Sequence, residues 1–575
     1  MNKQYKKFLL LLILSLFVVS NVSFAQSNSK EIDKLLETYR EYGQFNGTVL
    51  VAKDGKVIHQ KGYGMANMEW DIPNQPDTKF RIGSVTKQFT ATLILQLVSE
   101  GKIRLDGKIT DYLPDYRKDT GDKITIHQLL NHTSGIPSYT ALPGFFANDS
   151  RDPYSVADFI KKFASGDLEF EPGTKFNYNN SAYYLLGAII EKVDGKKFAE
   201  SLQKRILDPL GMKNTGYDVH QTILAKRARG YQKTPAGYEN AAYLDMDIPY
   251  SAGSMYSTVE DLLKWDQALY GDKILSAESK KLMFTPGLEN YGYGFFIEER
   301  PIGKSDKKVK IIQHGGGING FNCLFSRAVG QKTTIIILDN VGQGQFHTKI
   351  TDSIISILNG QPFDMPKRSI ADTLYKTAME KGGTSAVTEY RKLQSGAADT
   401  YDFSIDQLNM LGYQLLGRNK AKDAIEVFKL NVEMFPNESN PYDSLGEAYL
   451  KDGNKELALT NYKKAVELDP KNSAAREVVN RLEGKAVAVA PSILDTYIGE
   501  YELAPNFILT ITRDGEKLMG QATGQAKVEL VPVSESDFVI TAINGNISFE
   551  KDSGGNVTGL MLSQNGQKIP AKKIK

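Results

Sequence analysis

The fold of this protein depends on the stretch Phe80-Arg81-Ile82-Gly83-Ser84-Val85-Thr86-Lys87, which runs into the apolar segment Phe89-Thr90-Ala91-Thr92-Leu93-Ile94-Leu95-Gln96-Leu97-Val98. The pattern predicts a helix beginning near Ser84, so that Ser84 and Lys87 lie on one face, one turn apart. A serine hydroxyl is a weak nucleophile at neutral pH. A lysine amine in a partly dry pocket can lose its charge and accept the hydroxyl proton. Ser84 and Lys87 are therefore a candidate nucleophile and base.

The Ser-x-x-Lys spacing is a weak signal when taken alone. It recurs at Ser27, Ser201, Ser305 and Ser548. Ser84 is distinguished by the apolar helix that follows it and by two later polar segments. The first is Tyr178-Asn179-Asn180, in the turn before an apolar helix over 182–193, and the second is His314-Gly315-Gly316-Gly317, at the end of an expected strand.

Length and composition indicate an ordinary globular protein of several domains. At 575 residues the chain is too long for one core and suggests about three or four domains. The hydrophobic content is 41 %, the charged content is 24 %, and the net charge is +2. No block of basic residues stands out, so we expect no nucleic-acid partner.

The first 25 residues have the pattern of a secretory signal peptide. Three lysines precede the apolar run 8–19, and a small-residue cleavage site ends at Ala25. We therefore expect a periplasmic or secreted protein without a stable membrane span after cleavage. An uncleaved anchor is the alternative, but the apolar run is short for a span. The only cysteine, Cys323, is far from this site, so it provides no lipid attachment there, and it cannot form an internal disulfide.

Strand patterns stand at both ends of the first large region. Residues 47–62 read as two strands joined by the turn Asp54-Gly55, and residues 308–313 and 333–338 read as further strands. The segments between them have mainly helical patterns. His127 and His132 are five residues apart, which points them away from each other on a helix. We expect no metal there, and His132 is expected to have a structural role at a helix end.

Residues of about 30–360 resemble the serine β-lactamase and penicillin-binding-protein superfamily, nearest to class C β-lactamases and their esterase and peptidase relatives. Ser84-Val85-Thr86-Lys87 matches Ser-x-x-Lys, Tyr178-Asn179-Asn180 matches Tyr-x-Asn, and His314-Gly315-Gly316 stands where Lys-Thr-Gly usually stands. The resemblance implies a multidomain protein whose first domain is α/β (α+β) and transpeptidase-like, with an antiparallel sheet flanked by helices. It implies no metal or other cofactor.

The resemblance also implies a role for each matched residue. Ser84 would attack an amide or ester carbonyl and form an acyl-enzyme. Lys87 and Tyr178 would share the proton transfers, and the sequence does not decide which takes the first proton. Asn180 would donate to Lys87 or to a substrate amide. The backbone N–H groups of Ser84 and Gly317 would form the oxyanion hole.

The third motif departs from the usual pattern. His314 is mostly neutral at pH 7 and cannot supply a permanent cation for a substrate carboxylate. With His314 and Gly316 as expected substrate-binding residues, we favour an esterase, D-amino-acid amidase or peptidase over a β-lactamase, acting on a small molecule or a cell-wall peptide. Each residue taken singly also has a structural reading: Tyr178 as a core aromatic, Asn180 as a helix cap, and His314 as a sheet histidine. An inactive, binding-only relative is the remaining alternative.

The region after a short linker at 361–369 is predicted to be helical and repetitive. Gly412 and Gly446, and likewise Pro436 and Pro470, are 34 residues apart, which is the tetratricopeptide spacing. We place the helical region at 370–485, with clear repeats at about 407–472. A segment at 370–408 would supply an earlier helical pair. These repeats would either bind a protein or peptide partner, as in a peptidoglycan-binding scaffold, or act as a rigid spacer.

The last region, 491–575, changes to short alternating and apolar runs such as 507–511 and 557–562. Turns such as Asp514-Gly515 and Asn544-Gly545 separate these runs. We predict a small antiparallel barrel or sandwich, which resembles the lipocalin-like β-domain often appended to such hydrolases.

Overall fold

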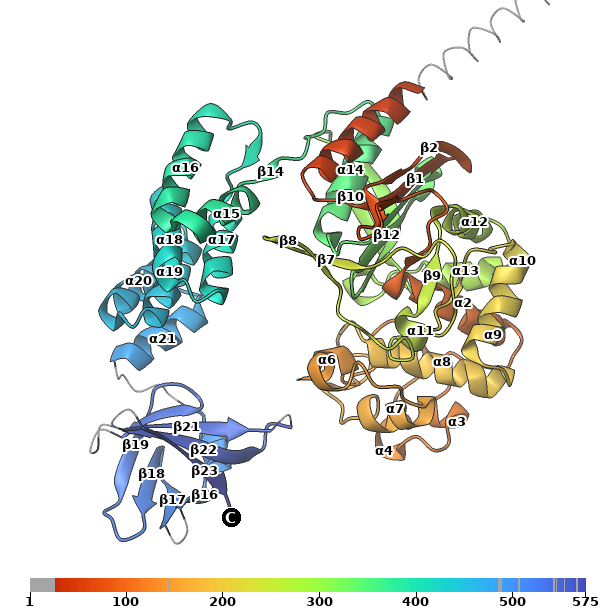
Figure 1. The fold of residues 1–575 in the computed structure, drawn as a ribbon. Coiled ribbons are helices and arrows are strands. Elements are labelled where there is room, and N and C mark those ends of the chain that lie inside the picture. The colour runs from red at the N-terminus through yellow and green to blue at the C-terminus, as the bar shows by residue number, and fades with distance from the viewer. Residues whose placement is uncertain are drawn as a thin grey trace, which may run out of the picture. The chain divides into compact units, whose positions relative to one another are not determined.

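The computed structural model describes residues 26–575 except 143, 484–488, 505–506, 541–542, 544, 553 and 565–566. The predicted signal peptide, 1–25, lies outside these described residues. The chain forms two compact units. The first ends at Pro366 and the second begins at Lys367. Figure 1 shows both units, coloured along the chain.

The first unit is built on a six-stranded antiparallel sheet in the order β10-β11-β12-β13-β1-β2. Because β1 pairs with β13, the first and last parts of this unit meet in the middle of the sheet. The predicted hairpin at Asp54-Gly55 joins β1 and β2. The strands are β1 (Gly47–Lys53), β2 (Lys56–Tyr63), β10 (Phe296–Pro301), β11 (Lys308–Ile318), β12 (Phe321–Ala328) and β13 (Thr333–Asp339).

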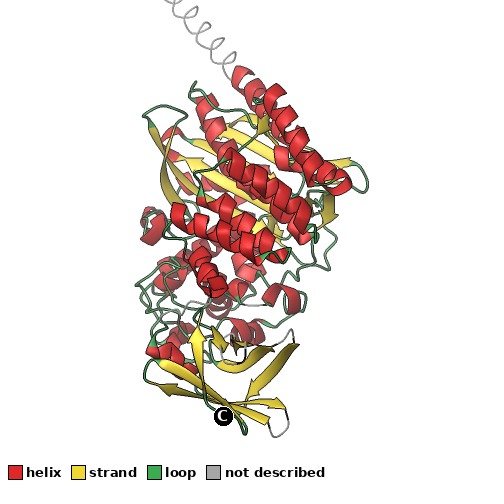
Figure 2. Ribbon diagram, turned by 90° about the vertical axis from the view of Figure 1, so that its left-hand side faces the viewer, coloured by secondary structure: helices red, strands yellow, loops and turns green. Residues whose placement is uncertain are grey.

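Helices cover both faces of this sheet (Figure 2). Side chains alternate along a strand, so Val49 and Val51 of β1 pack on one face with a helix over 26–41 and with α14 (His347–Leu358). Leu50, between them, joins the larger core on the other face. The structure thus confirms an antiparallel sheet flanked by helices.

The central element of the larger core is α2 (Thr86–Ser99), which follows a single 3₁₀ turn over Gly83–Val85. Eleven of its 14 residues are buried. A helix that is apolar on nearly every side must be covered on nearly every side. Phe89 stacks on Trp265 of α12 (Val259–Tyr270) with ring centroids 4.3 Å apart.

The remaining helices and strands of this unit surround α2 and the cleft described below. The further helices are α3 (Ile109–Tyr112), α4 (Lys118–Gly121), α5 (Ile126–Leu130), α6 (Phe145–Asn148), α7 (Val156–Phe163), α8 (Asn180–Asp194), α9 (Phe198–Leu202), α10 (Asp208–Leu210), α11 (Tyr250–Gly253) and α13 (Ala277–Met283). The further strands are β3 (Met65–Asn67), β4 (Ile72–Pro73), β5 (Phe80–Arg81), β6 (Gly216–Tyr217), β7 (Tyr231–Thr234), β8 (Gly237–Asn240) and β9 (Met255–Ser257).

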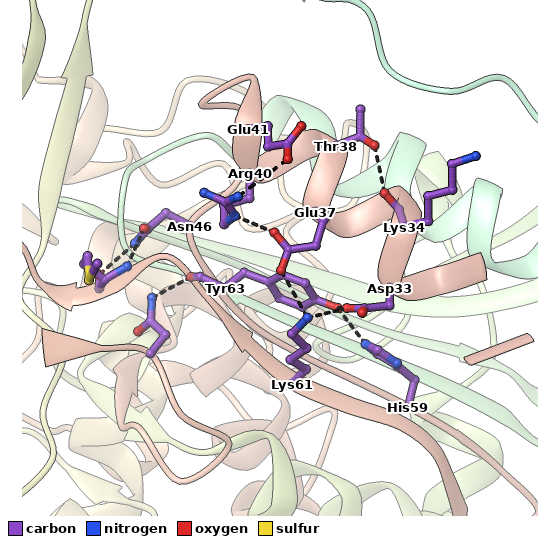
Figure 3. A network of polar contacts seen from close by, with 12 residues as sticks. Asp33, Lys34, Glu37, Thr38, Arg40, Glu41, Asn46, His59, Lys61 and Tyr63 are labelled. Atoms are coloured by element: carbon purple, nitrogen blue, oxygen red, sulfur yellow. Dashed lines mark hydrogen bonds and ion pairs between the residues drawn. The ribbon is translucent and has the colours of Figure 1, made fainter. Parts of the chain in front are cut away.

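A polar network attaches the helix over 26–41 to the edge strand β2 (Figure 3). The Asp33 carboxylate accepts hydrogen bonds from Lys61 Nζ at 2.7 Å and from the Tyr63 hydroxyl at 2.9 Å. His59 Nε2 lies 2.7 Å from the same hydroxyl, and Glu37 accepts a second bond from Lys61. These contacts complement the apolar packing of the helix.

The second unit begins with paired helices. The segment expected to hold an earlier pair forms α15 (Ile370–Lys381) and α16 (Gly383–Gly396). Arg368 and Ser369, expected in the linker, form the short strand β14, which pairs in parallel with β15 (Tyr401–Asp402). The following helices are α17 (Ile405–Gly417), α18 (Ala421–Met434), α19 (Ser439–Lys451), α20 (Lys455–Leu468) and α21 (Ser473–Glu483).

The C-terminal part, after the short helix α22 (Pro491–Thr496), is a closed eight-stranded antiparallel barrel, which confirms the predicted all-β region. Its first and last strands pair, so the sheet closes on itself. The strands are β16 (Gly499–Ala504), β17 (Phe507–Asp514), β18 (Lys517–Ala522), β19 (Val528–Pro532), β20 (Asp537–Ile540), β21 (Gly545–Lys551), β22 (Val557–Gln564) and β23 (Gln567–Lys573).

Candidate active site

Ser84 and Lys87 are brought together by the start of α2. Ser84 lies in the 3₁₀ turn, and Lys87 lies in the first turn of the helix, fully buried. Gly83 has a φ of +48°, which suits glycine, and a Cβ atom there would lie 2.9 Å from the Gly317 nitrogen. The turn that carries Ser84 can therefore approach the end of β11 closely.

The Lys87 amine has three hydrogen-bond partners. Nζ lies 3.0 Å from Ser84 Oγ, 2.8 Å from Asn180 Oδ1 and 2.9 Å from the Ala252 carbonyl oxygen. Complete burial, with no carboxylate among these partners, holds the pKa of Lys87 well below its usual 10.5. The amine therefore has a strong tendency to be neutral in the folded protein.

The side-chain amide of Asn180 is oriented by the hydrogen bond that its nitrogen donates. Its Nδ2 donates to Thr140 Oγ1 at 3.0 Å, and its backbone N–H donates to Ser138 Oγ at 3.2 Å. An amide that donates to Thr140 must present its oxygen to Lys87. Asn180, the first residue of α8, thus holds the lysine amine in place as an acceptor, so the expected donation from Asn180 to Lys87 is wrong. Donation to a substrate amide stays a prediction.

Tyr178 lies over the same amine. Lys87 Nζ is 4.9 Å from the centre of the Tyr178 ring, and the Tyr178 hydroxyl is buried without a hydrogen-bond partner among the described residues. Burial raises the pKa of Tyr178, with the Ser84 hydroxyl exerting a smaller opposing effect. The phenol is therefore protonated at neutral pH.

His132 packs against Tyr178 from the protein interior, with ring centroids 4.4 Å apart. It follows the end of α5 with a φ of +61°, and its Nδ1 accepts the backbone N–H of Asn179 at 3.0 Å. Burial holds the pKa of His132 well below 6.5. This histidine positions the segment that carries Tyr178, as its expected place at a helix end suggested.

His314 and Gly316 lie behind the cleft rather than in its lining. His314 Nδ1 donates to the Gly315 carbonyl oxygen at 2.5 Å, so Nε2 is the acceptor for the Tyr291 hydroxyl at 3.1 Å. Burial and the nearby Lys87 lower the pKa of His314 to about 3, so the ring is neutral. A Cβ atom on Gly316 would lie 2.0 Å from the Ile82 carbonyl oxygen. Direct contact of His314 or Gly316 with a substrate stays a prediction.

A cleft of about 350 Å³ opens beside Ser84. Ser84, Asn180 and Gly317 all contribute to its lining. Both residues of the expected oxyanion hole thus line the cleft, and the role of their backbone N–H groups stays a prediction. The rest of the lining consists of Gly83, Tyr139, Thr140, Phe146, Gln232 of β7, five residues between 244 and 253, residues 318–320 and Asn322 around the turn between β11 and β12, and Gly342.

Sequence reasoning missed two partners of these residues. Ala252 contributes only a backbone carbonyl, which no residue type encodes. Tyr291, which bonds His314, stands in a loop without a motif. Only the tertiary structure brings either one to the site.

The comparison with known protein families agrees with this geometry. The family described as Beta-lactamase matches residues 32–358, more than half of the chain. This chain belongs to the β-lactamase family. Its activity class is therefore hydrolase. A tetratricopeptide repeat family matches residues 440–472, and a domain of unknown function (DUF3471) matches residues 483–573.

Several characterised proteins resemble the first unit. A penicillin-binding protein of Bacillus subtilis (strain 168) is 31 % identical over 373 residues, covering 60 % of this chain and 79 % of the relative. A teichoic acid D-alanine hydrolase of Staphylococcus aureus is 30 % identical, covering 54 % and 73 %. A crystal structure of a D-amino acid amidase from Ochrobactrum anthropi has a TM-score of 0.51 and 26 % identity, covering 58 % and 99 %.

Among the described residues, no helix is both long enough and apolar enough to cross a membrane.

Proposed function

We propose that this protein is an exported serine hydrolase that cleaves amide or ester bonds through an acyl-enzyme on Ser84. The observation that carries the proposal is the buried Lys87 amine, 3.0 Å from the Ser84 hydroxyl and free of any carboxylate partner among the described residues. The similarity to a teichoic acid D-alanine hydrolase and to a D-amino acid amidase supports the D-amino-acid amidase, peptidase or esterase type.

The hydrogen bonds of Lys87 favour this residue as the first proton acceptor. A neutral amine has two N–H bonds and one lone pair. The Asn180 oxygen and the Ala252 carbonyl oxygen can only accept, so they take both N–H bonds. The lone pair then faces Ser84 Oγ, the third partner. Ser84 can pass its proton to Lys87 as its oxygen attacks the substrate carbonyl carbon.

The next steps use the same groups. The negative charge that develops on the carbonyl oxygen would be stabilised by the backbone N–H groups of Ser84 and Gly317. The bond to the leaving alcohol or amine breaks, and that group takes a proton from Tyr178, whose phenol is protonated. The proton held by Lys87 restores the phenol. A water molecule then attacks the acyl-enzyme while Lys87 accepts its proton. The ester bond to Ser84 breaks, Lys87 returns the proton to Ser84 Oγ, and the acid leaves.

The first test is intact-protein mass spectrometry after brief exposure to a fluorophosphonate, with Ser84→Ala as the control. An adduct on the parent protein that is absent from the variant would support the proposal. If the parent protein gained no adduct, the nucleophile assignment would be rejected, and the binding-only scaffold would become the better reading.

Penicillin and a cephalosporin reporter, tested on the same protein, distinguish the proposed function from the β-lactamase alternative. The neutral, buried His314 gives the site no permanent cation for the β-lactam carboxylate. We expect slow turnover of both compounds, and rapid cephalosporin hydrolysis would favour the β-lactamase reading.

A further inference from the structure

Among the described residues, nothing in the lining of the cleft beside Ser84 carries a formal charge. The lining consists of Gly83, Ser84, Tyr139, Thr140, Phe146, Asn180, Gln232, Leu244, Ile248, Pro249, Ala252, Gly253, Gly317, Ile318, Asn319, Gly320, Asn322 and Gly342. These residues contain no lysine, arginine, histidine, aspartate or glutamate.

The apolar part of the lining is substantial. Tyr139, Leu244 and Ile248 are each less than 5 % exposed, so their side chains form a fixed wall rather than a flexible rim. Phe146 is 52 % exposed and offers an aromatic surface toward solvent. Among the described residues, this wall therefore offers no side chain of opposite charge to a bound ammonium or carboxylate group.

Two ionisable residues on the neighbouring segments, Arg81 and Asp245, have other partners. Arg81, three residues before Ser84, pairs with the buried Asp218 at 2.7 Å. Asp245, next to Leu244, accepts hydrogen bonds from the Tyr243 hydroxyl and the Asp247 backbone. The two groups closest to the chemistry, Lys87 and His314, are both held toward their neutral forms by burial.

We propose that this cleft selects substrates whose acyl group is uncharged: an N-acylated amino acid or a simple apolar acid, in place of one with a free amine or carboxylate. Among the types proposed above, this favours a peptidase or esterase that acts on N-acylated compounds over an amidase of free D-amino acids. The inference rests on the proposed function of Ser84 and specifies its substrate class. A charged acyl group would lose hydration on entering the cleft without gaining an ionic partner, and that loss is costly. A neutral acyl group loses little and gains contact with Leu244 and Ile248.

Two isosteric pairs of substrates test the proposal on the full chain. All four are thiobenzyl esters of N-acyl-D-alanine, so the bond cleaved and the thiol released are the same. The cationic N-betainyl compound is paired with N-(3,3-dimethylbutanoyl), and the anionic N-succinyl compound with N-succinamoyl. We expect kcat/KM for each neutral member to exceed that of its charged isostere by roughly tenfold or more.

Charge-changing variants at Gln232 supply the second measurement. This exposed side chain lies at the cleft, near Gly342. For each pair, we compare the ratio of kcat/KM for the charged compound to kcat/KM for its neutral isostere. Gln232→Glu should raise this ratio for the cationic betainyl compound and lower it for the anionic succinyl compound. Gln232→Lys should have the opposite effect on both ratios. Gln331→Glu, in the turn between β12 and β13 and outside the lining, is the matched control and should leave both ratios unchanged.

The outcomes distinguish this proposal from the function on which it rests. Equal rates within the isosteric pairs, with cleavage that depends on Ser84, would overturn the neutral-acyl proposal and leave the hydrolase intact. Ratios that respond equally to Gln232→Glu and Gln331→Glu would also overturn it, because the cleft would then not be the origin. If Ser84 failed to label with fluorophosphonate and no ester were cleaved, both proposals would fall.

Discussion

The carbonyl oxygen of Ala252 accepts a hydrogen bond from Lys87 Nζ at 2.9 Å, between residues 165 positions apart in the sequence. This contact and the Asn180 oxygen account for both N–H bonds of a neutral lysine amine. The proposed base, Lys87, is therefore aimed at Ser84 by a backbone carbonyl and a side-chain amide. Because neither partner is charged, burial determines the protonation state of Lys87.

The pH dependence of acylation should respond to a charge at Asn180. Burial lowers the pKa of Lys87, so the active, neutral amine is present well below pH 10.5, and kcat/KM should rise as pH passes through that lowered pKa. Asn180→Asp places a carboxylate beside the amine and favours its charged form. The rise should then move to higher pH by about one to three units. Asn180→Ala, which adds no charge, should lower the rate without this upward shift, and an unchanged profile in Asn180→Asp would contradict Lys87 as the base.

Tyr178→Phe should slow the reaction without unfolding the protein. The hydroxyl is buried without a hydrogen-bond partner among the described residues, so its loss removes no native bond that we observe. The loss of a proton donor should reduce single-turnover acylation by about 10²- to 10⁴-fold. Tyr270→Phe is the control because its hydroxyl is likewise buried without a hydrogen-bond partner among the described residues, and Tyr270 is the last residue of α12. Comparable rates in the two variants would exclude a proton-transfer role for Tyr178.

His314→Lys should not turn this protein into a β-lactamase. His314 is 3 % exposed and hydrogen-bonded to Tyr291, so the substituted ammonium would be buried beside Lys87. An unpaired buried charge is costly, and we expect a lower melting temperature with no faster cephalosporin hydrolysis. His314→Gln, which introduces no charge, should lose less stability. Faster cephalosporin turnover in His314→Lys, at unchanged stability, would show that position 314 reaches the substrate.

Asp266→Ala should strongly destabilise the first unit. Asp266 is fully buried on α12, where it accepts from Arg327 Nε at 2.6 Å and from Thr334 Oγ1 at 2.7 Å, and so ties this helix to β12 and β13. Removing one partner of a buried ion pair leaves the other charge uncompensated, which typically costs about 3 to 5 kcal/mol. Denaturant unfolding measures the loss. Asp106→Ala breaks an exposed pair with Arg104 and should change the free energy of unfolding little; equal losses would contradict this account.

The sequence predicted which residues belong to the candidate site, but not how all of their side chains are positioned in it. The Ser-x-x-Lys spacing places Ser84 and Lys87 on one helical turn, and that local geometry is what the structure contains. The predicted strands at both ends of the unit also pair as β1 and β13. By contrast, the positions of His314 and Gly316 behind the cleft could not be read from the motif, because the direction of a side chain depends on strand register and on neighbouring segments.

The amino-acid sequence by itself determined the local structure and the chemistry available to this protein: the helix that carries the serine and lysine, the hairpin, the 34-residue repeats and the alternating strands near the C-terminus. These follow from periodicity, turn residues and side-chain type, which act over short stretches. Only the tertiary structure decided that Lys87 is buried, that the Ala252 carbonyl orients its amine, and that the cleft lining has no charge in the described chain. Burial and hydrogen bonding between distant segments depend on packing, and packing sets the protonation state on which the proposed reaction depends.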